Sequence, residues 1–129
     1  MRRRFADAAV ARLATATADA RPQVVPCCFV LQGSIGFTAV DAKPKTTSRL
    51  QRIRNIEENP AVSLIVDHYD DDWTQLWWVR VDGRARVVTD HGERAAALDL
   101  LAAKYLQYRE TRPPGPVIAI DIEHWRAWP

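Results

Sequence analysis

The sequence predicts a mainly β (α+β) domain: a small closed or partly closed barrel of six to seven antiparallel strands with two to three helices. Short apolar runs with strand-like alternation recur along the chain, and the helical segments are inserted between them. Tight turn signals join neighbouring runs, and such short connections link antiparallel rather than parallel strands. A barrel is the natural way to hide so many strand edges.

The first 40 residues predict one helix and three strands. Phe5 and Ala8 fall at helical spacing in residues 3–12. Pro26 interrupts the second strand, so we expect an edge or a bulge there. Gly33 lies in a tight hairpin before the third strand. The three strands are predicted at residues 13–17, 23–31 and 35–40.

The remainder predicts two helices and three strands. Ser48 is a plausible N-cap for a helix at residues 49–58, which Asn59-Pro60 ends. Asp90 and Glu93 form a capping box for the second helix. That helix carries one apolar face, made by Ala95, Leu98, Leu101, Ala102 and Tyr105. The strands are predicted at residues 61–69, at 75–88 with an interruption at Asp82-Gly83, and at 117–128.

Length and composition indicate one globular domain spanning residues 1–129. The net charge of +2 does not by itself argue for nucleic acid. The two cysteines, Cys27 and Cys28, are adjacent, which excludes a disulfide framework and favours two small buried residues. No stretch approaches the roughly 20 apolar residues that a membrane span needs. We therefore expect a cytoplasmic protein, with neither a membrane nor nucleic acid as its partner.

The strongest local signal is a basic segment followed by a helix. Five basic residues and no acidic one lie between Ala42 and Ile56: Lys43, Lys45, Arg49, Arg52 and Arg54. Thr46, Thr47 and Ser48 add hydroxyl donors. Fixed positive charge, short donors and free N–H groups at a helix N-terminus are what phosphate binding requires.

Helical geometry separates the arginines of this segment. Arg49 and Arg52 border the apolar stripe, whereas Arg54 points away from them. A side chain at the border of a buried stripe can reach into a cleft, and Arg54 is expected to be solvated. A basic surface helix without a ligand is the alternative interpretation.

Five tryptophans are many for a domain of this size. Trp77 should share a strand face with Val79 and Val81 and fill the core, while Trp78 shares the opposite face with Arg80. Aromatic residues outside a core favour interfaces and planar-ligand pockets, which makes Trp78 a candidate cofactor-binding residue.

No metal site or catalytic residue is predicted. His68 lies among acidic residues, but consecutive acids on a loop tip do not converge on one ion without further ligands. The sequence also contains no Gly-rich dinucleotide fingerprint, P-loop or nucleophile elbow.

Taken in order, several segments resemble the split β-barrel flavoproteins of the pyridoxamine 5′-phosphate oxidase type, and most closely the branch of probable coenzyme F420-dependent enzymes. The matching segments are Leu-Ala-Thr-Ala at 13–16, Arg-Pro-Gln-Val-Val-Pro at 21–26, Arg-Ile-Arg-Asn-Ile at 52–56 with Asn-Pro at 59–60, Trp-Trp-Val-Arg-Val-Asp-Gly-Arg-Ala at 77–85, and Trp-Arg-Ala-Trp at 125–128. The loop at 41–47 and the shorter C-terminus depart from the oxidase pattern, and no pyridoxal phosphate-binding residues are evident.

The resemblance implies a homodimer with two cofactor sites at the subunit interface. Arg52 stands where such proteins carry a basic residue that contacts the cofactor phosphate, and the flanking loop contains Lys43, Lys45, Thr46 and Thr47. The strand whose backbone lines the cofactor ring matches residues 25–28, which include Val25, Pro26 and Cys27.

These observations predict an F420-dependent oxidoreductase that transfers a hydride between the deazaflavin and a small organic substrate. The cofactor would carry the chemistry, so no acid–base residue needs to be visible. FMN in the same pocket is the close alternative. A non-catalytic flavin- or deazaflavin-binding protein is another, and a nucleic-acid-binding barrel that stacks bases on its tryptophans is a third.

Overall fold

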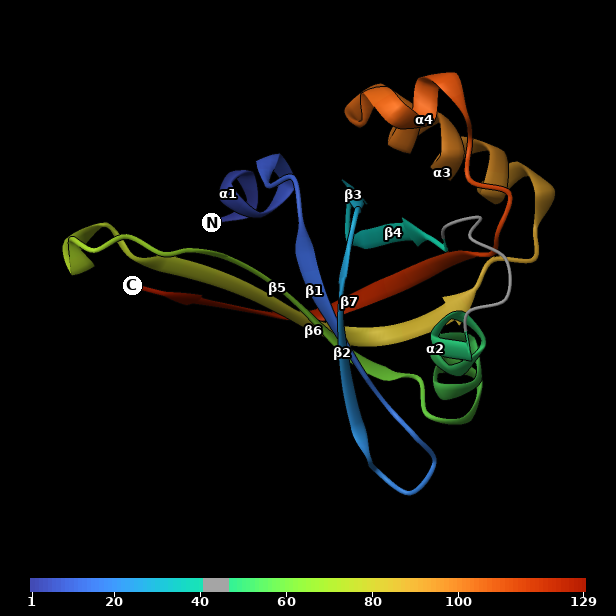
Figure 1. Ribbon diagram of the computed structural model, residues 1–129, viewed down its shortest axis with the longest axis horizontal. Helices are drawn as coiled ribbons and strands as arrows, with labels where there is room; N and C mark the ends of the chain where they lie inside the picture. Colours follow the sequence, from blue (N-terminus) through green and yellow to red (C-terminus); the bar gives the residue numbers. More distant parts are fainter. Residues whose placement is uncertain (41–46) are drawn as a thin grey trace.

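A single seven-stranded antiparallel sheet, curled into a half-barrel, forms the body of the protein (Figure 1). The computed structural model describes residues 1–40 and 47–129. Its strands are β1 (Ala11–Ala16), β2 (Pro22–Cys27), β3 (Val30–Gln32), β4 (Ile35–Ala39), β5 (Ala61–His68), β6 (Trp77–Val87) and β7 (Val117–Trp128). Their order across the sheet is β2-β1-β5-β6-β7-β4-β3, so the predicted mainly β split barrel is confirmed.

Four α-helices and one short 3₁₀ helix lie around the sheet in the described residues. They are α1 (Arg2–Asp7), α2 (Thr47–Glu58), η1 (Trp73–Gln75), α3 (His91–Lys104) and α4 (Leu106–Glu110). Helix α2 packs on β1 and β6, whereas α3 packs on β3 and β4. No described helix is long and apolar enough to cross a membrane.

The core has two parts because β7 buries both of its faces at its N-terminal end. Ile118 and Ile120 join a cluster inside the barrel, which also contains Phe5, Leu13, Phe29, Leu64, Val79 and Val81. Val117 and Ala119 point the other way and pack under α3 with Phe37, Ala97 and Leu101. The alternation of strand side chains therefore divides the two clusters.

One end of the sheet projects as a three-stranded arm, formed by residues 66–80 and 125–128. Strand β1 pairs with β5 only at residues 63–65 of β5, and β4 pairs with β7 only at residues 117–121 of β7. Beyond those pairs β5, β6 and β7 continue alone (Figure 1). The arm and α2 lie at opposite ends of the molecule.

Several sequence predictions are confirmed. The last strand spans residues 117–128 as expected. The register of β6 against β7 shifts at the predicted interruption, between Asp82 and Gly83. Pro26 lies on an edge strand, β2. The Asp90 side chain caps α3 by accepting a hydrogen bond from the Glu93 N–H at 2.8 Å.

The predicted strand at 23–31 is wrong, because two strands occupy that segment. Cys27 is the last residue of β2 to pair with β1, opposite Ala11. The chain then turns, Phe29 becomes fully buried, and the Cys28 carbonyl accepts a hydrogen bond from Thr38 at 2.6 Å. β3 therefore pairs with β4 at the far edge of the sheet.

The predicted helices also need correction. The first spans Arg2–Asp7 rather than 3–12, and β1 begins at Ala11. Helix α2 begins at Thr47, so Ser48 lies within it and is not its N-cap. The described residues form four α-helices rather than two to three, because the extended backbone of Tyr105 separates α4 from α3. On α3 the buried face contains Ala97, and Ala95 is exposed.

Candidate functional site

Helix α2 is held against the sheet by one buried amide. The Asn55 side chain is only 1% exposed. It donates hydrogen bonds to Thr15 Oγ1 at 3.1 Å and Gln23 Oε1 at 3.0 Å, and it accepts one from Gln51 Nε2 at 2.8 Å. These bonds join α2 to β1 and β2 at once, which fixes the helix against the strands beside it.

Arg52 lies one helical turn before Asn55 and points inward. Its side chain is half-buried, and its Nε is buried with no hydrogen-bond partner among the described residues. Arg54 is exposed, as the helical geometry predicted. A buried guanidinium N–H without an acceptor costs free energy. The position of Arg52 therefore suits a ligand that supplies a hydrogen-bond acceptor.

Cys27 interacts electrostatically with Arg52. Burial raises the pKa of the Cys27 thiol to about 11, while the Thr38 hydrogen bond and the Arg52 charge oppose this effect. The thiol is therefore neutral at physiological pH. The structure thus brings Cys27 at the end of β2 within electrostatic reach of Arg52 in the middle of α2.

The other predicted residues fall into three groups. Val25 is half-buried against the core, and Pro26 is exposed opposite Arg12 of β1. Thr47 and Arg49 belong to α2, but their side chains are not described. The positions of Lys43, Lys45 and Thr46 lie outside the described residues.

Trp78 does not join this group within one chain. It lies on the arm, opposite Trp128 in the register of β6 and β7, and the Arg80 guanidinium lies 5.9 Å from its ring centroid. The arm and α2 are at opposite ends of the molecule (Figure 1). A contact of Trp78 with a cofactor at Arg52 would have to come from a second copy of the chain.

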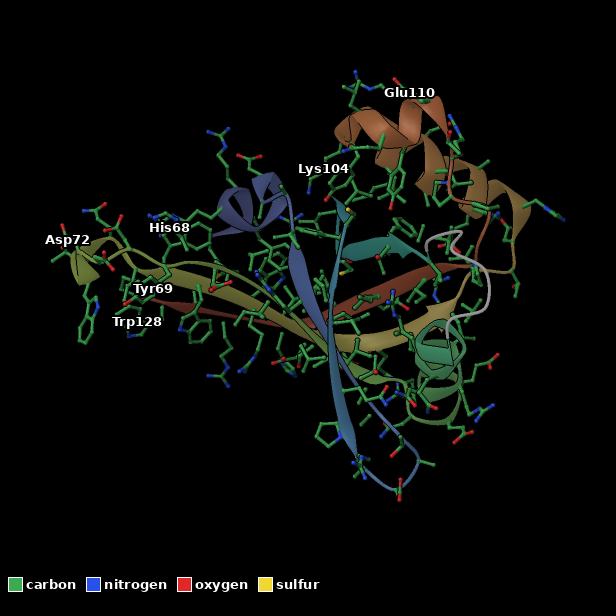
Figure 2. The ribbon with its side chains drawn as sticks, in the orientation of Figure 1. His68, Tyr69, Asp72, Lys104, Glu110 and Trp128 are labelled. Atoms are coloured by element: carbon green, nitrogen blue, oxygen red, sulfur yellow. The ribbon has the colours of Figure 1, made fainter. Side chains whose placement is uncertain are left out.

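The arm carries most of the exposed aromatic surface (Figure 2). Trp73 is 70% exposed, Tyr69 67% and Trp128 49%. Trp77 instead packs against the barrel core, as its strand face predicted. The surplus of tryptophan noted in the sequence is therefore concentrated at one end of the molecule.

The acidic loop at the arm tip has a local structural role. Asp72 accepts hydrogen bonds from Thr74, which lower the pKa of its carboxyl group and cap η1. The His68 Nε2 lies 3.9 Å from an Asp70 oxygen. Within residues 1–40 and 47–129, no three His, Cys, Asp or Glu side chains are placed to hold a metal ion.

Sequence reasoning missed two polar clusters. The first is the Asn55 network, whose only signal was an amide set between Ile53 and Ile56 of the apolar stripe. In the second, Lys104 Nζ donates to the Phe29 carbonyl at 2.9 Å, and the Phe29 N–H donates to the Tyr105 hydroxyl oxygen at 3.0 Å. Burial lowers the pKa of Lys104 and raises that of Tyr105 to about 12.

One protein-family profile matches the whole chain. The profile described as pyridoxamine 5′-phosphate oxidase matches residues 1–129. No curated protein matches the chain at a significant level.

Solved structures share the fold at low sequence identity. An FAD-binding protein from Mesorhizobium loti is 24% identical with a TM-score of 0.72, and the match covers 95% of this chain and 87% of that one. The FAD-binding protein from Mycobacterium smegmatis is 20% identical with a TM-score of 0.66, over 98% and 88% of the two chains. The heme storage protein HutZ from Vibrio cholerae is 17% identical with a TM-score of 0.71, over 93% and 84%.

Proposed function

The chain belongs to the pyridoxamine 5′-phosphate oxidase family, and from that premise we propose that it is an oxidoreductase that uses a flavin-type cofactor, coenzyme F420, for hydride transfer to or from a small organic substrate. The observation that carries this proposal is the inward-pointing Arg52 with its unpartnered, buried Nε. A phosphate oxygen is an acceptor of the right charge for that donor.

The surroundings of Arg52 fit a phosphate better than they fit a protein carboxylate. Among the described residues, Arg52 interacts electrostatically with the Cys27 thiol, which is neutral and brings no negative charge. Asn55 holds the backbone of α2, so the guanidinium is presented from a fixed helix. A preorganised donor loses less conformational entropy on binding than a mobile surface arginine would.

The remaining predicted residues would complete the cofactor site. We assign the loop residues Lys43, Lys45 and Thr46, together with Thr47 and Arg49 of α2, to the phosphate end. The end of β2, from Val25 to Cys27, would line the ring. Five basic residues in this segment exceed what the single phosphate of FMN needs. An additional anionic tail, as on coenzyme F420, would use that surplus.

The cofactor, once bound, supplies the hydride chemistry. The protein residues have three tasks: Arg52 neutralises the phosphate, Asn55 holds the helix that carries Arg52, and the apolar side chains of β2 exclude water from the ring. The buried Cys27 thiol stays protonated because its pKa is about 11, so it adds no charge beside the ring.

We also propose that the protein acts as a homodimer that pairs through the outer face of the arm. Trp78, Trp128 and Asp67 lie in one cross-strand row on that face, with Arg80 and Arg126 in the next. Tryptophan and arginine are enriched at protein interfaces. In a dimer where this face packs against the α2 end of the other copy, Trp78 of one copy would lie toward the cofactor site of the other.

Sedimentation at micromolar concentration tests the dimer. We expect a dimer whose dissociation constant rises when Trp128 is replaced by Ser. A monomer that still binds cofactor with full affinity would contradict the interface site.

Titration of the purified protein with F420, FMN and FAD, followed by tryptophan quenching, tests the cofactor. We expect F420 to bind more tightly than FMN. Oxidation of a substrate should bleach the deazaflavin absorbance as the cofactor is reduced, and reduction of a substrate by the reduced cofactor should restore it. Protein that purifies yellow with one FMN or FAD per chain would contradict the F420 assignment. Tight binding of F420 without turnover by any reductant would favour a non-catalytic carrier.

A further inference from the structure

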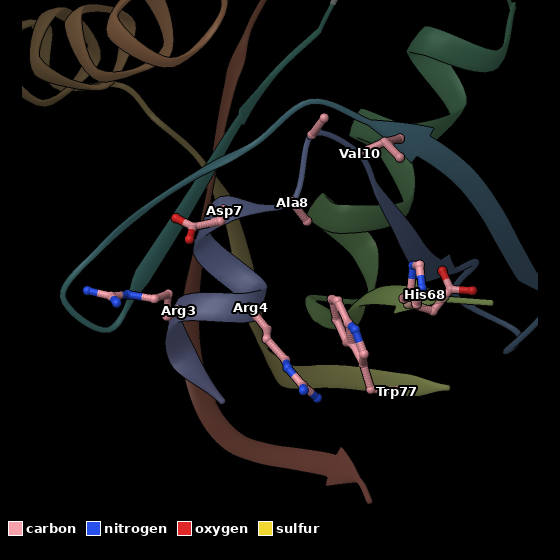
Figure 3. A pocket seen from close by; sticks show the side chains of 9 residues that line it. Arg3, Arg4, Asp7, Ala8, Val10, His68 and Trp77 are labelled. Carbon is pink, nitrogen blue, oxygen red and sulfur yellow. The ribbon is translucent and has the colours of Figure 1, made fainter. Parts of the chain in front are cut away.

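A cavity of about 490 Å³ opens between α1 and the root of the arm, beside β5 and β6 (Figure 3). That volume lies in the range of small-molecule sites. None of its lining residues is among those predicted to bind the cofactor. Trp77, on the opposite strand face from Trp78, forms one wall.

Trp77 is braced by two neighbours, so the wall is preformed. The Arg4 guanidinium lies 5.0 Å from the Trp77 ring centroid. The His68 ring stacks on it with the centroids 6.1 Å apart and the planes at 21°. Figure 3 shows Arg4 directed toward Trp77, with His68 on the other side of the indole. Because these side chains are already held in place, a ligand can bind without the loss of conformational entropy that ordering them would require.

Each acidic residue of the cavity interacts with a cation outside it. The Asp67 carboxylate forms an ion pair with Arg12 at 3.2 Å. The Asp7 carboxylate interacts with the Lys104 ammonium. Neither Arg12 nor Lys104 lines the cavity. The negative charge in the wall is therefore partly offset.

The positive charge of Arg4 is not balanced in the same way. A cation–π contact uses the face of a guanidinium and leaves its in-plane N–H donors free. Within residues 1–40 and 47–129, Arg4 forms no hydrogen bond or ion pair. By contrast, Arg2 of the same helix donates to the Gly33 carbonyl at 2.6 Å. Arg4 thus presents an unused fork of donors at the cavity wall.

Next to that fork, the cavity is apolar. Ala8 and Val10 line it together with the Trp77 ring. Val10 is 39% exposed, which leaves apolar surface available to a ligand.

We propose that this cavity is a second binding site, separate from the cofactor cleft, for a small planar aromatic carboxylate. The carboxylate would accept two hydrogen bonds from the Arg4 fork, because that geometry matches a guanidinium. The ring would cover Ala8 and Val10 beside Trp77. The two acidic residues in the wall disfavour a dianion such as a phosphate monoester.

Benzoate is the probe, and its neutral isostere benzamide is the matched control. The readout is the indole N–H resonance of Trp77, assigned from its loss in Trp77→Phe. We expect benzoate to shift this resonance saturably and benzamide to bind about 10-fold more weakly or worse, because it lacks the charge. Equal affinities, or no shift up to about 10 mM benzoate, would overturn the proposal.

Two variants distinguish hydrogen bonding by the Arg4 guanidinium from the effect of the overall positive charge of α1. Arg4→Gln should weaken benzoate binding about 10- to 100-fold, which is the loss expected when a charge-assisted hydrogen bond is removed. Arg3→Gln removes the same charge from a residue that also lines the cavity but whose side chain points away from Trp77 (Figure 3), and it should change the affinity less than about 3-fold. Equal losses in both variants would overturn the proposal.

Two further measurements keep the test independent of folding and of the cofactor. Ala8→Phe fills the cavity while Arg4 remains, so it should abolish benzoate binding and leave FMN or F420 binding unchanged. Saturating cofactor should leave the benzoate affinity unchanged. Retained benzoate binding in Ala8→Phe, or competition between benzoate and the cofactor, would contradict a separate site at this cavity.

Discussion

Replacing Asn55 with alanine tests how α2 is held. The wild-type side chain makes three hydrogen bonds, to Thr15, Gln23 and Gln51. Each such bond contributes about 1 kcal/mol net, and leaving a buried partner unsatisfied costs more. Thr15 is only 5% exposed and cannot turn to water, whereas Gln23 and Gln51 are half-buried and can. The expected loss in free energy of unfolding is therefore about 2–3 kcal/mol.

Urea denaturation is the assay, with the midpoint expected to fall while the slope stays unchanged. The melting temperature should drop by about 6–12 °C. Asn59→Ala is the matched control, because the Asn59 side chain lies one turn later and makes a single bond, to the Thr17 carbonyl at 3.2 Å. It should cost about 1 kcal/mol or less. If Asn55→Ala costs no more than Asn59→Ala, the three-bond anchor does not hold α2 as described.

Three other predictions concern different parts of the chain. Ellman's reagent should label one thiol in the native protein and two after unfolding, and Cys28→Ser should abolish the native reaction, because the buried Cys27 has its pKa raised to about 11. The hydrogen bonds from Arg86 lower the pKa of Glu93 from its ordinary value of 4.5. They therefore stabilise the fold above pH 4.5, and this stabilisation is lost as the pH falls through the lowered pKa. Acid denaturation of Glu93→Gln should accordingly depend less on pH than that of the wild type. Gly83→Ala should lower the melting temperature sharply, because the added Cβ would collide with a backbone oxygen of β7, whereas Ala85→Gly on the same strand should cost only about 1 kcal/mol.

The sequence predicted the parts of the fold that depend on local pattern. The alternation along β7 and the interruption of β6 at Asp82-Gly83 could be predicted because each depends only on residues adjacent in the sequence. The break between β2 and β3 was not, since it depends on Thr38 and on contacts of Phe29 with Lys104 and Tyr105, about 75 residues away.

In the candidate site, too, the sequence predicted local features and missed those that depend on residues distant in the chain. Helical periodicity separated Arg52 from Arg54 because both lie on one regular element. The anchoring role of Asn55 depends on Thr15 and Gln23, which approach it only after β1 and β2 have paired. The pocket wall at Trp77 depends likewise on α1 folding back over the arm, which places Arg4 beside a residue far along the chain.

The contrast between two arginines of α2 tests the central claim most directly. Isothermal titration of F420 or FMN should show that Arg52→Ala weakens binding by about 10- to 100-fold, since a charge-assisted bond contributes roughly 1.5–3 kcal/mol. Arg54→Ala removes an equal charge from the exposed side of the same helix and should change the affinity little. Equal losses would mean that a diffuse basic field attracts the cofactor, and an unchanged affinity in Arg52→Ala would place the phosphate elsewhere.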